Sequence, residues 1–432
     1  MELISTRGGT PPVGFLDAVA ANLPGDGGLF VPADLAPLAD LERLLALGWR
    51  ERSTEILARL LAPEISRAEA AALVAGALDF PVPLVRVRDG LWALELCHGP
   101  SLSFKDFGVR FLARVLALAA GRSARARNRL VLTATSGDTG AAVAAAFHGL
   151  AGFRVAVLYP RGRISERQER QIATLGGNVR AFAVDGDFDA CQRLVKSCFA
   201  DAALAAELGL VSANSINVAR LTAQVLYYFE AVAALERAAP GAPRPVVAVP
   251  SGNFGNLCAG LLARRLGLPL AGLVLATNAN RTVPDYLDHG RWAPGPTVAT
   301  LSNAMDVALP NNWERVAWLF DGDLAALRAG LRWGSLDDAG TRAELARLAV
   351  AGYRADPHGA VAAAVVERAL ARGEVGIFLA TAHPAKFEAS AEGVPLPAAL
   401  AAAMRRPLLA EPLDADPAAL RRALGGGPGE AG

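Results

Sequence analysis

Lysine is rare in this chain, and one lysine lies inside a polar motif that could do chemistry. Although the chain has 43 lysine and arginine residues, lysine occurs only at Lys105, Lys196 and Lys386. Arginine serves wherever a surface cation is enough, but it cannot lose its proton and act as an amine nucleophile. A lysine that persists in this background is expected where a deprotonated amine is needed. Lys105, in CHGPSLSFKDFG, is therefore the candidate nucleophile.

Two glycine-rich, polar turns follow predicted strands. They are TATSGDTGAAVAAAF, residues 133–147, and VPSGNFGNLCAGLLARRL, residues 249–266. Glycine lets the backbone approach an anion, and the amide groups at a helix N-terminus then bind it with the helix dipole behind them. A tight strand-to-helix connection explains one such turn equally well. Two of them indicate two anionic groups that are held close together.

Two further polar clusters lie at the ends of predicted elements. SANSINVARL, residues 212–221, opens a helix, although an ordinary N-cap with a solvated arginine would give the same pattern. FLATAHPAKF, residues 378–387, ends a strand, and its lysine could either reach a phosphate or lie on the surface. Lys196 lies in a helical run and is predicted to be exposed. The polar residues of the two clusters are Asn214, Ser215, Asn217 and Arg220, and Thr381, His383 and Lys386.

Several common enzyme classes lack their motifs in this chain. The five histidines show no HxxxH, HxH or HExxH spacing, so a metal site is not expected. The GxSxG motif of serine hydrolases is missing, and so are GxxxxGK[ST] and a GxGxxG that follows a strand. An amine among anion-binding turns is what pyridoxal phosphate (PLP) requires. Its aldehyde forms a Schiff base with lysine, its phosphate needs backbone amides, and its ring nitrogen needs a polar partner.

Short apolar runs alternate with longer amphipathic ones from about residue 91 onward. This alternation predicts an α/β fold with helices around mostly parallel sheets. Helices are expected from Asn217 to Leu235 and from the capping box Ser165-Glu-Arg-Gln168 to a point near the glycines at 176 and 177. The stretch 289–312 is rich in proline and asparagine and is expected to line a site. The predicted strands are 91–96, 129–135, 153–160, 179–184, 245–250, 270–277 and 375–381.

Composition and charge narrow the possible partners. A net charge of +1 gives no general attraction to nucleic acid or to an anionic membrane. The N-terminus lacks the pattern of a signal peptide, and charged residues interrupt every long apolar run, so a cytoplasmic protein without membrane spans is expected. The sequence leaves a monomer and a homodimer open. Four cysteines without a CxxC motif are expected to be reduced, with Cys191 and Cys198 packed on one helical face.

A series of motifs in matching order resembles threonine synthase, in the longer bacterial and fungal type of the fold-type II PLP enzymes, the group of tryptophan synthase β. The resemblance covers almost the full chain. It implies open twisted sheets with flanking helices and a mainly helical N-terminal unit. The motifs are ISTRG, DGGLFVP, HGPSLSFKDFG, TATSGDTGAA, LGGNV, DGDFDACQ, ANSIN, PSGNFGN, ATNAN, SNAMDVALPNNWER, DPHGA and TAHPAKF.

The resemblance also implies a role for individual residues. Lys105 would hold the cofactor and move protons, and Thr381 would hydrogen-bond the ring nitrogen. Asp138 would lie near the ring hydroxyl. The cofactor phosphate would be bound by Gly252, Asn253, Phe254, Gly255 and Asn256. The substrate carboxylate would be bound by Thr135, Ser136 and Thr139, and the substrate phosphate by Asn214, Ser215, Arg220 and Lys386.

The implied reaction converts O-phospho-L-homoserine and water to L-threonine and phosphate, the last step of threonine biosynthesis. It needs three anion sites, which agrees with the two glycine-rich turns and the polar cluster at 212–221. A phospho-lyase that releases 2-oxobutyrate, ammonia and phosphate would share this cofactor set, whereas a serine or threonine ammonia-lyase would have no use for Arg220. A catalytically silent binding protein of the same fold would not need Lys105. Two departures from the family pattern are Arg281, where an acidic residue is expected, and Asn256, where aspartate is also common.

The predicted domain organisation has three parts. Residues 1–80 would form the N-terminal domain, and residues 81–388 would form the catalytic region with two α/β subdomains. Residues 389–432 would form a C-terminal helical segment with a flexible tail, GGGPGEAG.

Overall fold

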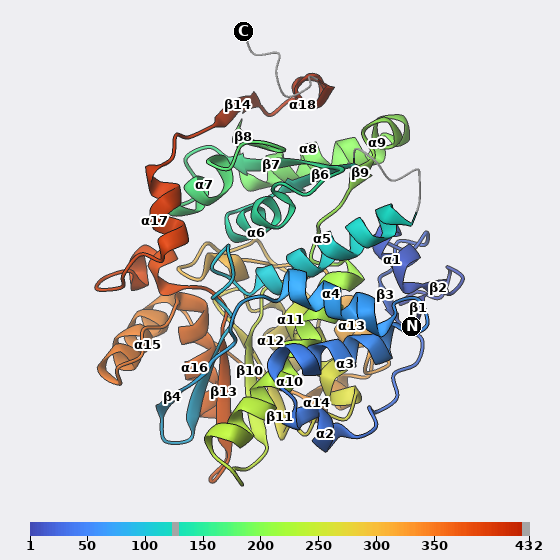
Figure 1. Ribbon diagram of the computed structural model, residues 1–432. Coiled ribbons are helices and arrows are strands. Elements are labelled where there is room, and N and C mark those ends of the chain that lie inside the picture. Colours follow the sequence, from blue (N-terminus) through green and yellow to red (C-terminus); the bar gives the residue numbers. More distant parts are fainter. Residues whose placement is uncertain (123–128, 426–432) are drawn as a thin grey trace. The chain divides into compact units, whose positions relative to one another are not determined.

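The computed structural model describes residues 1–122 and 129–425 (Figure 1). Two compact units are present. Unit 1 comprises Met1–Phe111 and Ser215–Val394, and unit 2 comprises Leu112–Asn214 and Pro395–Gly432. The predicted catalytic region, 81–388, is thus divided between both units, and the bounds of the three predicted parts stay predictions. The tail predicted to be flexible lies outside the described residues except for Gly425, which ends the last helix.

The first part of unit 1 is mainly helical, as predicted. It also holds a small antiparallel sheet in the order β2-β1-β3. One helix begins at a capping box, in which Ser66 Oγ accepts from Glu69 N and the Glu69 carboxylate accepts from Ser66 N. The elements are β1 (Glu2–Ser5), β2 (Val13–Gly14), α1 (Phe15–Ala21), β3 (Phe30–Pro32), α2 (Leu41–Ala46), α3 (Trp49–Leu61) and α4 (Arg67–Ala77).

A six-stranded sheet lies at the centre of unit 1, in the order β12-β11-β10-β13-β5-β4. Neighbouring strands are parallel except for β4 with β5. Every residue of β10 and β11 is buried, as parallel strands covered on both faces require. The strands are β4 (Leu84–Arg88), β5 (Leu91–Glu95), β10 (Pro245–Pro250), β11 (Gly272–Thr277), β12 (Arg332–Ser335) and β13 (Val375–Ala380).

Helices cover this sheet and lead into the turns at its edge. α16 packs on β10, β11 and β13, and its residues from Pro357 to Val366 are buried. α10 is buried from Val218 to Leu235, so it is a core helix with apolar residues on all sides. The helices are α5 (Lys105–Gly121, which continues into unit 2), α10 (Val218–Ala238), α11 (Gly255–Arg265), α12 (Thr282–His289), α13 (Trp313–Trp318), α14 (Leu324–Gly330), α15 (Asp338–Val350) and α16 (Pro357–Ala369), with the 3-10 helices η1 (Asn303–Met305), η2 (Pro384–Lys386) and η3 (Glu388–Ser390).

Unit 2 contains a five-stranded parallel sheet in the order β14-β8-β7-β6-β9. Its core includes Cys191 and Cys198 beside Leu194 on one face of α8, which confirms the packing predicted for these cysteines. The strands are β6 (Arg129–Ala134), β7 (Phe153–Pro160), β8 (Val179–Asp185), β9 (Leu210–Val211) and β14 (Ala410–Asp414). The helices are α6 (Asp138–Phe147), α7 (Glu166–Ala173), α8 (Phe188–Ala200), α9 (Ala202–Leu208), α17 (Ala398–Arg405) and α18 (Pro417–Gly425).

All seven predicted strands are present, and the fold class is confirmed as α/β with mostly parallel sheets. The predicted capping box opens α7, with Ser165 Oγ accepting from Gln168 N, but the helix ends at Ala173, before the two glycines. Most of 289–312 is irregular. Among the described residues, no helix is both long and apolar enough to cross a membrane.

Candidate active site

Lys105 is the first residue of α5 and follows an irregular segment that pairs with the end of β13. Phe104 N donates to Thr381 O over 2.8 Å, and His383 N donates to Leu102 O over 3.0 Å. Leu102 has a φ of 58°, a left-handed conformation that turns the chain into this pairing. Lys105 is half-buried, with Nζ 5.0 Å from the centre of the Phe104 ring. Backbone pairing thus brings the segment that bears Lys105 directly onto Thr381.

Two buried side chains, Asp106 and Lys386, hold the loop before Lys105. No pattern in the sequence indicated that they contact the same residue. Asp106 Oδ2 accepts from Ser101 N over 2.9 Å, and Lys386 Nζ donates to Ser101 O over 2.8 Å. Gly99 must be glycine, because a Cβ there would lie 2.4 Å from Asp106 Oδ2. Lys386 is 1% exposed, so its alternative assignment to the surface is wrong.

Burial raises the pKa of Asp106 to about 6, which predicts a pH-dependent stability. Because the folded state holds this proton more tightly than the unfolded state, the contribution of Asp106 to stability is largest below pH about 4. It is lost as the pH rises through about 6. In the variant Asp106→Asn this loss should be absent. Thermal melting of both proteins across that window measures the difference, and two parallel pH profiles would contradict the prediction.

The turn between β10 and α11 holds the candidate phosphate-binding residues Gly252 to Asn256. A Cβ at Gly252 would lie 2.7 Å from Met305 Cα, so only glycine fits there. Phe254 has a φ of 60° at the start of α11. The Asn256 carboxamide oxygen accepts from the hydroxyls of Tyr227 and Tyr228, over 2.6 and 2.8 Å. Asn256 Nδ2 is buried and has no hydrogen-bond partner among the described residues.

Arg220 and Ser215 lie at the start of α10, in the same unit as this turn. Asn217 caps the helix, with Oδ1 accepting from Ala219 N over 3.0 Å. Arg220 is 2% exposed, so the solvated arginine of the alternative interpretation is wrong, and burial lowers the pKa of its guanidinium to about 10. Ser215 Oγ accepts from Asn253 Nδ2 over 2.6 Å, which joins the α10 start to the turn. Asn214 is exposed and is the last residue of its segment of unit 2.

The candidate carboxylate site lies between β6 and α6 in unit 2. Thr135 Oγ1 accepts from Gly137 N over 2.9 Å and from Gly140 N over 2.8 Å, so its hydroxyl oxygen organises the loop. Gly137 has a φ of 140°, which favours glycine. Ser136 is exposed and Thr139 is half-buried.

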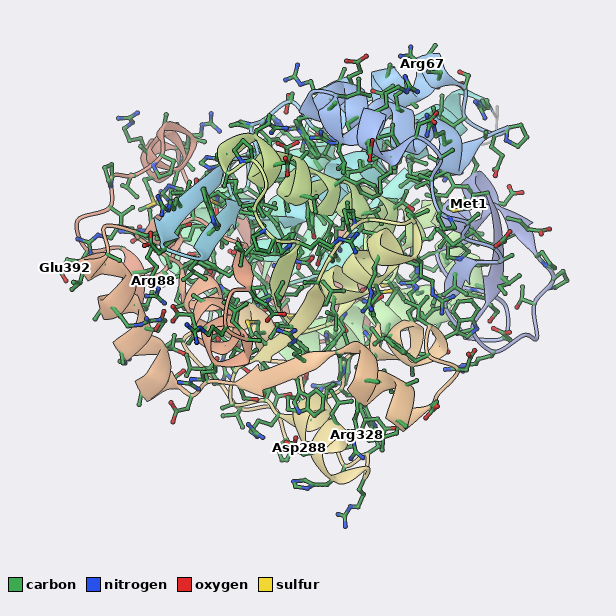
Figure 2. The ribbon with its side chains drawn as sticks, turned by 90° about the horizontal axis from the view of Figure 1, so that it is seen from below. Met1, Arg67, Arg88, Asp288, Arg328 and Glu392 are labelled. Atoms are coloured by element: carbon green, nitrogen blue, oxygen red, sulfur yellow. The ribbon has the colours of Figure 1, made fainter. Side chains whose placement is uncertain are left out.

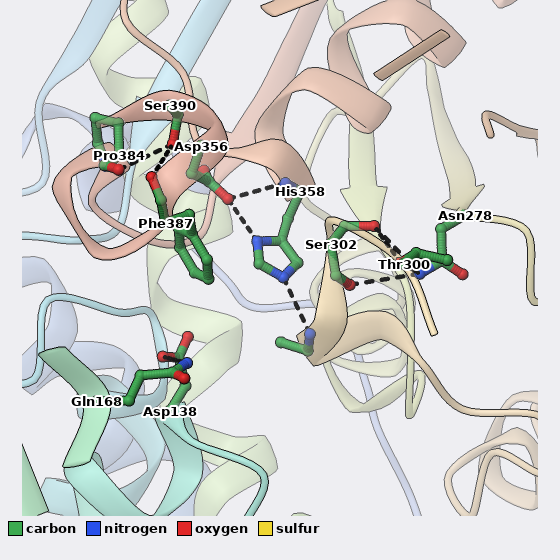
Figure 3. A network of polar contacts seen from close by, with 11 residues as sticks. Asp138, Gln168, Asn278, Thr300, Ser302, Asp356, His358, Pro384, Phe387 and Ser390 are labelled. Carbon is green, nitrogen blue, oxygen red and sulfur yellow. Dashed lines mark hydrogen bonds and ion pairs between the residues drawn. The ribbon is translucent and has the colours of Figure 1, made fainter. Parts of the chain in front are cut away.

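Asp138, the first residue of α6, is buried next to a residue from the following helix. Its Oδ1 accepts from Gln168 Nε2 over 3.1 Å (Figure 3). Gln168 also completes the capping box of α7, so one side chain serves both helices. The sequence identified Gln168 only as a cap. Its second contact could not be found from local spacing, because thirty residues separate it from Asp138.

A pair of Thr135 variants tests the role of its hydroxyl oxygen. Thr135→Val removes the acceptor while keeping the shape, and it leaves two buried amides unpaired. We expect kcat/KM to fall at least about tenfold and the thermal midpoint to drop. Thr135→Ser keeps the oxygen and should stay close to the wild type in both measurements. If Thr135→Val has the same kcat/KM and thermal midpoint as Thr135→Ser, the oxygen is dispensable.

Arg281, the departure from the expected pattern, belongs to an exposed ion-pair cluster on α12. It contacts Asp285 over 3.1 Å and Asp288 over 3.5 Å. Arg328 of α14 donates to the Asp288 carbonyl, and the two labelled residues lie close together in Figure 2. The local partners of Arg281 are therefore carboxylates of its own helix.

Comparison with known families and structures gives consistent matches. A family described as "Pyridoxal-phosphate dependent enzyme" matches residues 78–377, and one described as "Threonine synthase N terminus" matches residues 2–78. Threonine synthase of Haemophilus influenzae is 49% identical over 432 residues, covering 98% of this chain and 99% of the relative. The corresponding protein of Escherichia coli is 47% identical over 431 residues, covering 98% and 99%.

Solved structures of threonine synthases have the same fold. The Escherichia coli structure aligns with a TM-score of 0.90 at 47% identity, covering 98% of this chain and 99% of that one. A PLP-bound structure from Brucella melitensis aligns with a TM-score of 0.92 at 33% identity, covering 98% of each chain. A tomato threonine deaminase at 18% identity has a TM-score of 0.56, a likeness that concerns the fold alone.

Proposed function

Because the chain belongs to the threonine synthase family of PLP-dependent enzymes, we propose that it converts O-phospho-L-homoserine and water to L-threonine and phosphate. One observation carries the assignment of the site. β10, β13 and β5 are adjacent and parallel, so their carboxyl ends meet at one edge of the sheet. The turn Gly252 to Asn256, Thr381 and the segment before Lys105 follow these three strands. Ligands bind at this edge in open α/β sheets.

The residues at this edge fit the cofactor. Asn256 Nδ2 offers a buried donor that has no partner among the described residues, and glycine at position 252 lets the backbone of the turn pack directly against Met305. We assign the turn to the cofactor phosphate, Thr381 to the ring nitrogen and Asp138 to the region of the ring hydroxyl. Bound PLP supplies an electron sink that stabilises negative charge on the substrate carbons. Lys105 holds the cofactor through its amine.

The reaction places separate demands on the protein side chains. Lys105 Nζ takes and returns protons at the substrate carbons, which requires an amine that can be neutral. Arg220, with Ser215, Asn214 and Lys386, binds the leaving phosphate. A buried guanidinium attracts an anion more strongly than an exposed one because solvent screens it less. The released phosphate can in turn accept a proton from the attacking water.

The substrate carboxylate is assigned to the start of α6. Thr135 keeps the amides of Gly137 and Gly140 in a fixed arrangement, and Ser136 and Thr139 supply hydroxyl donors. The helix N-terminus adds its positive dipole end. Together these groups bind a carboxylate without a dedicated cation. That the enzyme works in the cytoplasm stays a prediction.

A product assay tests the proposed reaction. Purified protein with PLP is incubated with O-phospho-L-homoserine, and phosphate, threonine, 2-oxobutyrate and ammonia are quantified. The proposal expects equal amounts of phosphate and threonine. Release of 2-oxobutyrate and ammonia together with phosphate would instead identify the phospho-lyase reaction, which the near full-length identity to threonine synthases does not favour.

A further inference from the structure

His358 and Asp356 form a buried pair that has no role in the site described so far. They lie at the start of α16, 2% and 0% exposed. His358 Nδ1 is 2.6 Å from Asp356 Oδ1, and His358 Nε2 is 3.2 Å from Ala304 N (Figure 3). A backbone amide can only donate, so Nε2 is the acceptor and carries no proton. The proton of the neutral ring is then on Nδ1 and is donated to Asp356. Both ring nitrogens are used in one defined tautomer.

The partner of His358 lies directly behind the turn assigned to the cofactor phosphate. Ala304 and Met305 form the short helix η1 with Asn303. A Cβ at Gly252 would lie 2.7 Å from Met305 Cα and 3.0 Å from Ala304 O, so the backbones of η1 and the turn are already in contact. A movement of η1 would therefore shift the backbone that packs against Gly252 and with it the turn.

A second set of hydrogen bonds holds the same segment from its other side. Asn278, which follows β11, donates through Nδ2 to Thr300 Oγ1 over 2.8 Å and to Asp306 Oδ1 over 2.8 Å. Asp306 Oδ2 accepts from Thr300 N over 3.0 Å. Asn278 and Asp306 thus fix the ends of residues 300–306, and His358 holds the amide in between. Figure 3 shows Asn278 beside Thr300 and Ser302, which belong to the segment that His358 contacts.

We propose that His358, oriented by Asp356, is a positioning residue that holds η1 against Gly252 and so keeps the phosphate turn in its binding conformation. This inference rests on the assignment of Gly252 to Asn256 to the cofactor phosphate. The carboxylate of Asp356 also caps α16 by accepting from His358 N over 3.0 Å. Substitution of Asp356 would therefore disturb the helix itself, and the test uses His358.

Three substitutions separate the hydrogen bond from packing. His358 packs edge-on against the Phe387 ring, with centroids 5.1 Å apart. His358→Phe keeps a ring for this packing but has no acceptor. His358→Asn has a polar group near the Nδ1 position only, whereas the longer His358→Gln can place its carbonyl oxygen near the Nε2 position. The proposal expects that only the glutamine variant keeps an acceptor for the hydrogen bond from Ala304 N.

The readout is the affinity of the apoprotein for PLP, measured by titration of its visible absorption. We expect Kd to rise about tenfold in the phenylalanine and asparagine variants, the effect of one lost hydrogen bond, and to stay near the wild-type value in the glutamine variant. At saturating PLP, kcat should recover in all three. Unchanged PLP affinity in a folded phenylalanine variant overturns the proposal, and so does a lowered thermal midpoint without a change in Kd.

Two controls complete the experiment. Gly252→Ala inserts a Cβ against Met305 and should weaken PLP binding strongly. If this variant binds PLP normally, the assignment of the phosphate turn fails, whereas normal binding by the His358 variants alone rejects only the role of His358. In the wild-type apoprotein, nitrogen-15 NMR of the ring should find the proton on Nδ1. A proton on Nε2 would exclude the bond from Ala304 N and overturn the proposal even if no variant folds.

Discussion

Replacement of Lys105 by alanine is expected to lower kcat by about 10³- to 10⁴-fold, because it removes both the covalent attachment of PLP and the group that transfers protons. The variant should also lose the visible absorption band of the lysine-bound cofactor. Borohydride reduction followed by peptide mass spectrometry provides a second measurement. In the wild type the mass of the reduced cofactor should be found on the peptide that contains Lys105.

Matched variants distinguish the amine from the charge. Lys105→Arg keeps a cation but cannot form the covalent link, so it should be nearly as inactive as the alanine variant. Lys196→Ala removes an exposed lysine on α8 and should retain the wild-type rate and absorption. Modification of Lys196 or Lys386 after borohydride reduction, with Lys105 unmodified, would refute the assignment.

The core strands could be predicted from the sequence because each is a largely apolar run that a turn or loop bounds. β7, FRVAVLYP, and β10, PVVAVP, are buried along almost their whole length. The strands that were missed are two to five residues long, and all but β1 lie at a sheet edge. β4, LVRVR, and β14, AEPLD, are edge strands. β14 pairs with β8 although more than two hundred residues separate them, and local pattern carries no signal for such a pairing.

The ligand-binding residues of the site could be predicted from the sequence, but the residues that hold them in position could not. The glycine turns and Lys105 have local signatures in residue type and spacing. Lys386, Tyr227 and Tyr228 act through hydrogen bonds to segments that only the fold brings near. The burial of Arg220 did have a signal. Arg220 lies in the first turn of α10, and this helix is mostly apolar on all sides, which is typical of a core helix and predicts that its first turn is buried too.

The substitution Arg220→Met is expected to lower kcat/KM for O-phospho-L-homoserine by about 10²-fold or more, mainly through KM. Loss of one partner of a buried, charged hydrogen-bonded pair costs about 2–5 kcal/mol in binding. Methionine is similar in length and apolar, so the variant should fold. Burial lowers the pKa of Arg220 to about 10, which means that the fold disfavours its charge before substrate binds.

A second buried arginine provides the control for this last experiment. Arg315 is fully buried and donates to the carbonyls of Phe30 and Ile216, so it ties α13 to two other segments. Arg315→Met leaves those carbonyls without a donor and should lower the thermal midpoint, with PLP-saturated KM close to the wild type. Binding of inorganic phosphate, measured as competitive inhibition, should weaken in the Arg220 variant only. If folded Arg220→Met has an unchanged KM and unchanged inhibition by phosphate, Arg220 does not belong to the substrate-phosphate site. A buried cation that contacts the phosphate would stabilise the bound enzyme relative to the free enzyme, and its removal would raise both constants.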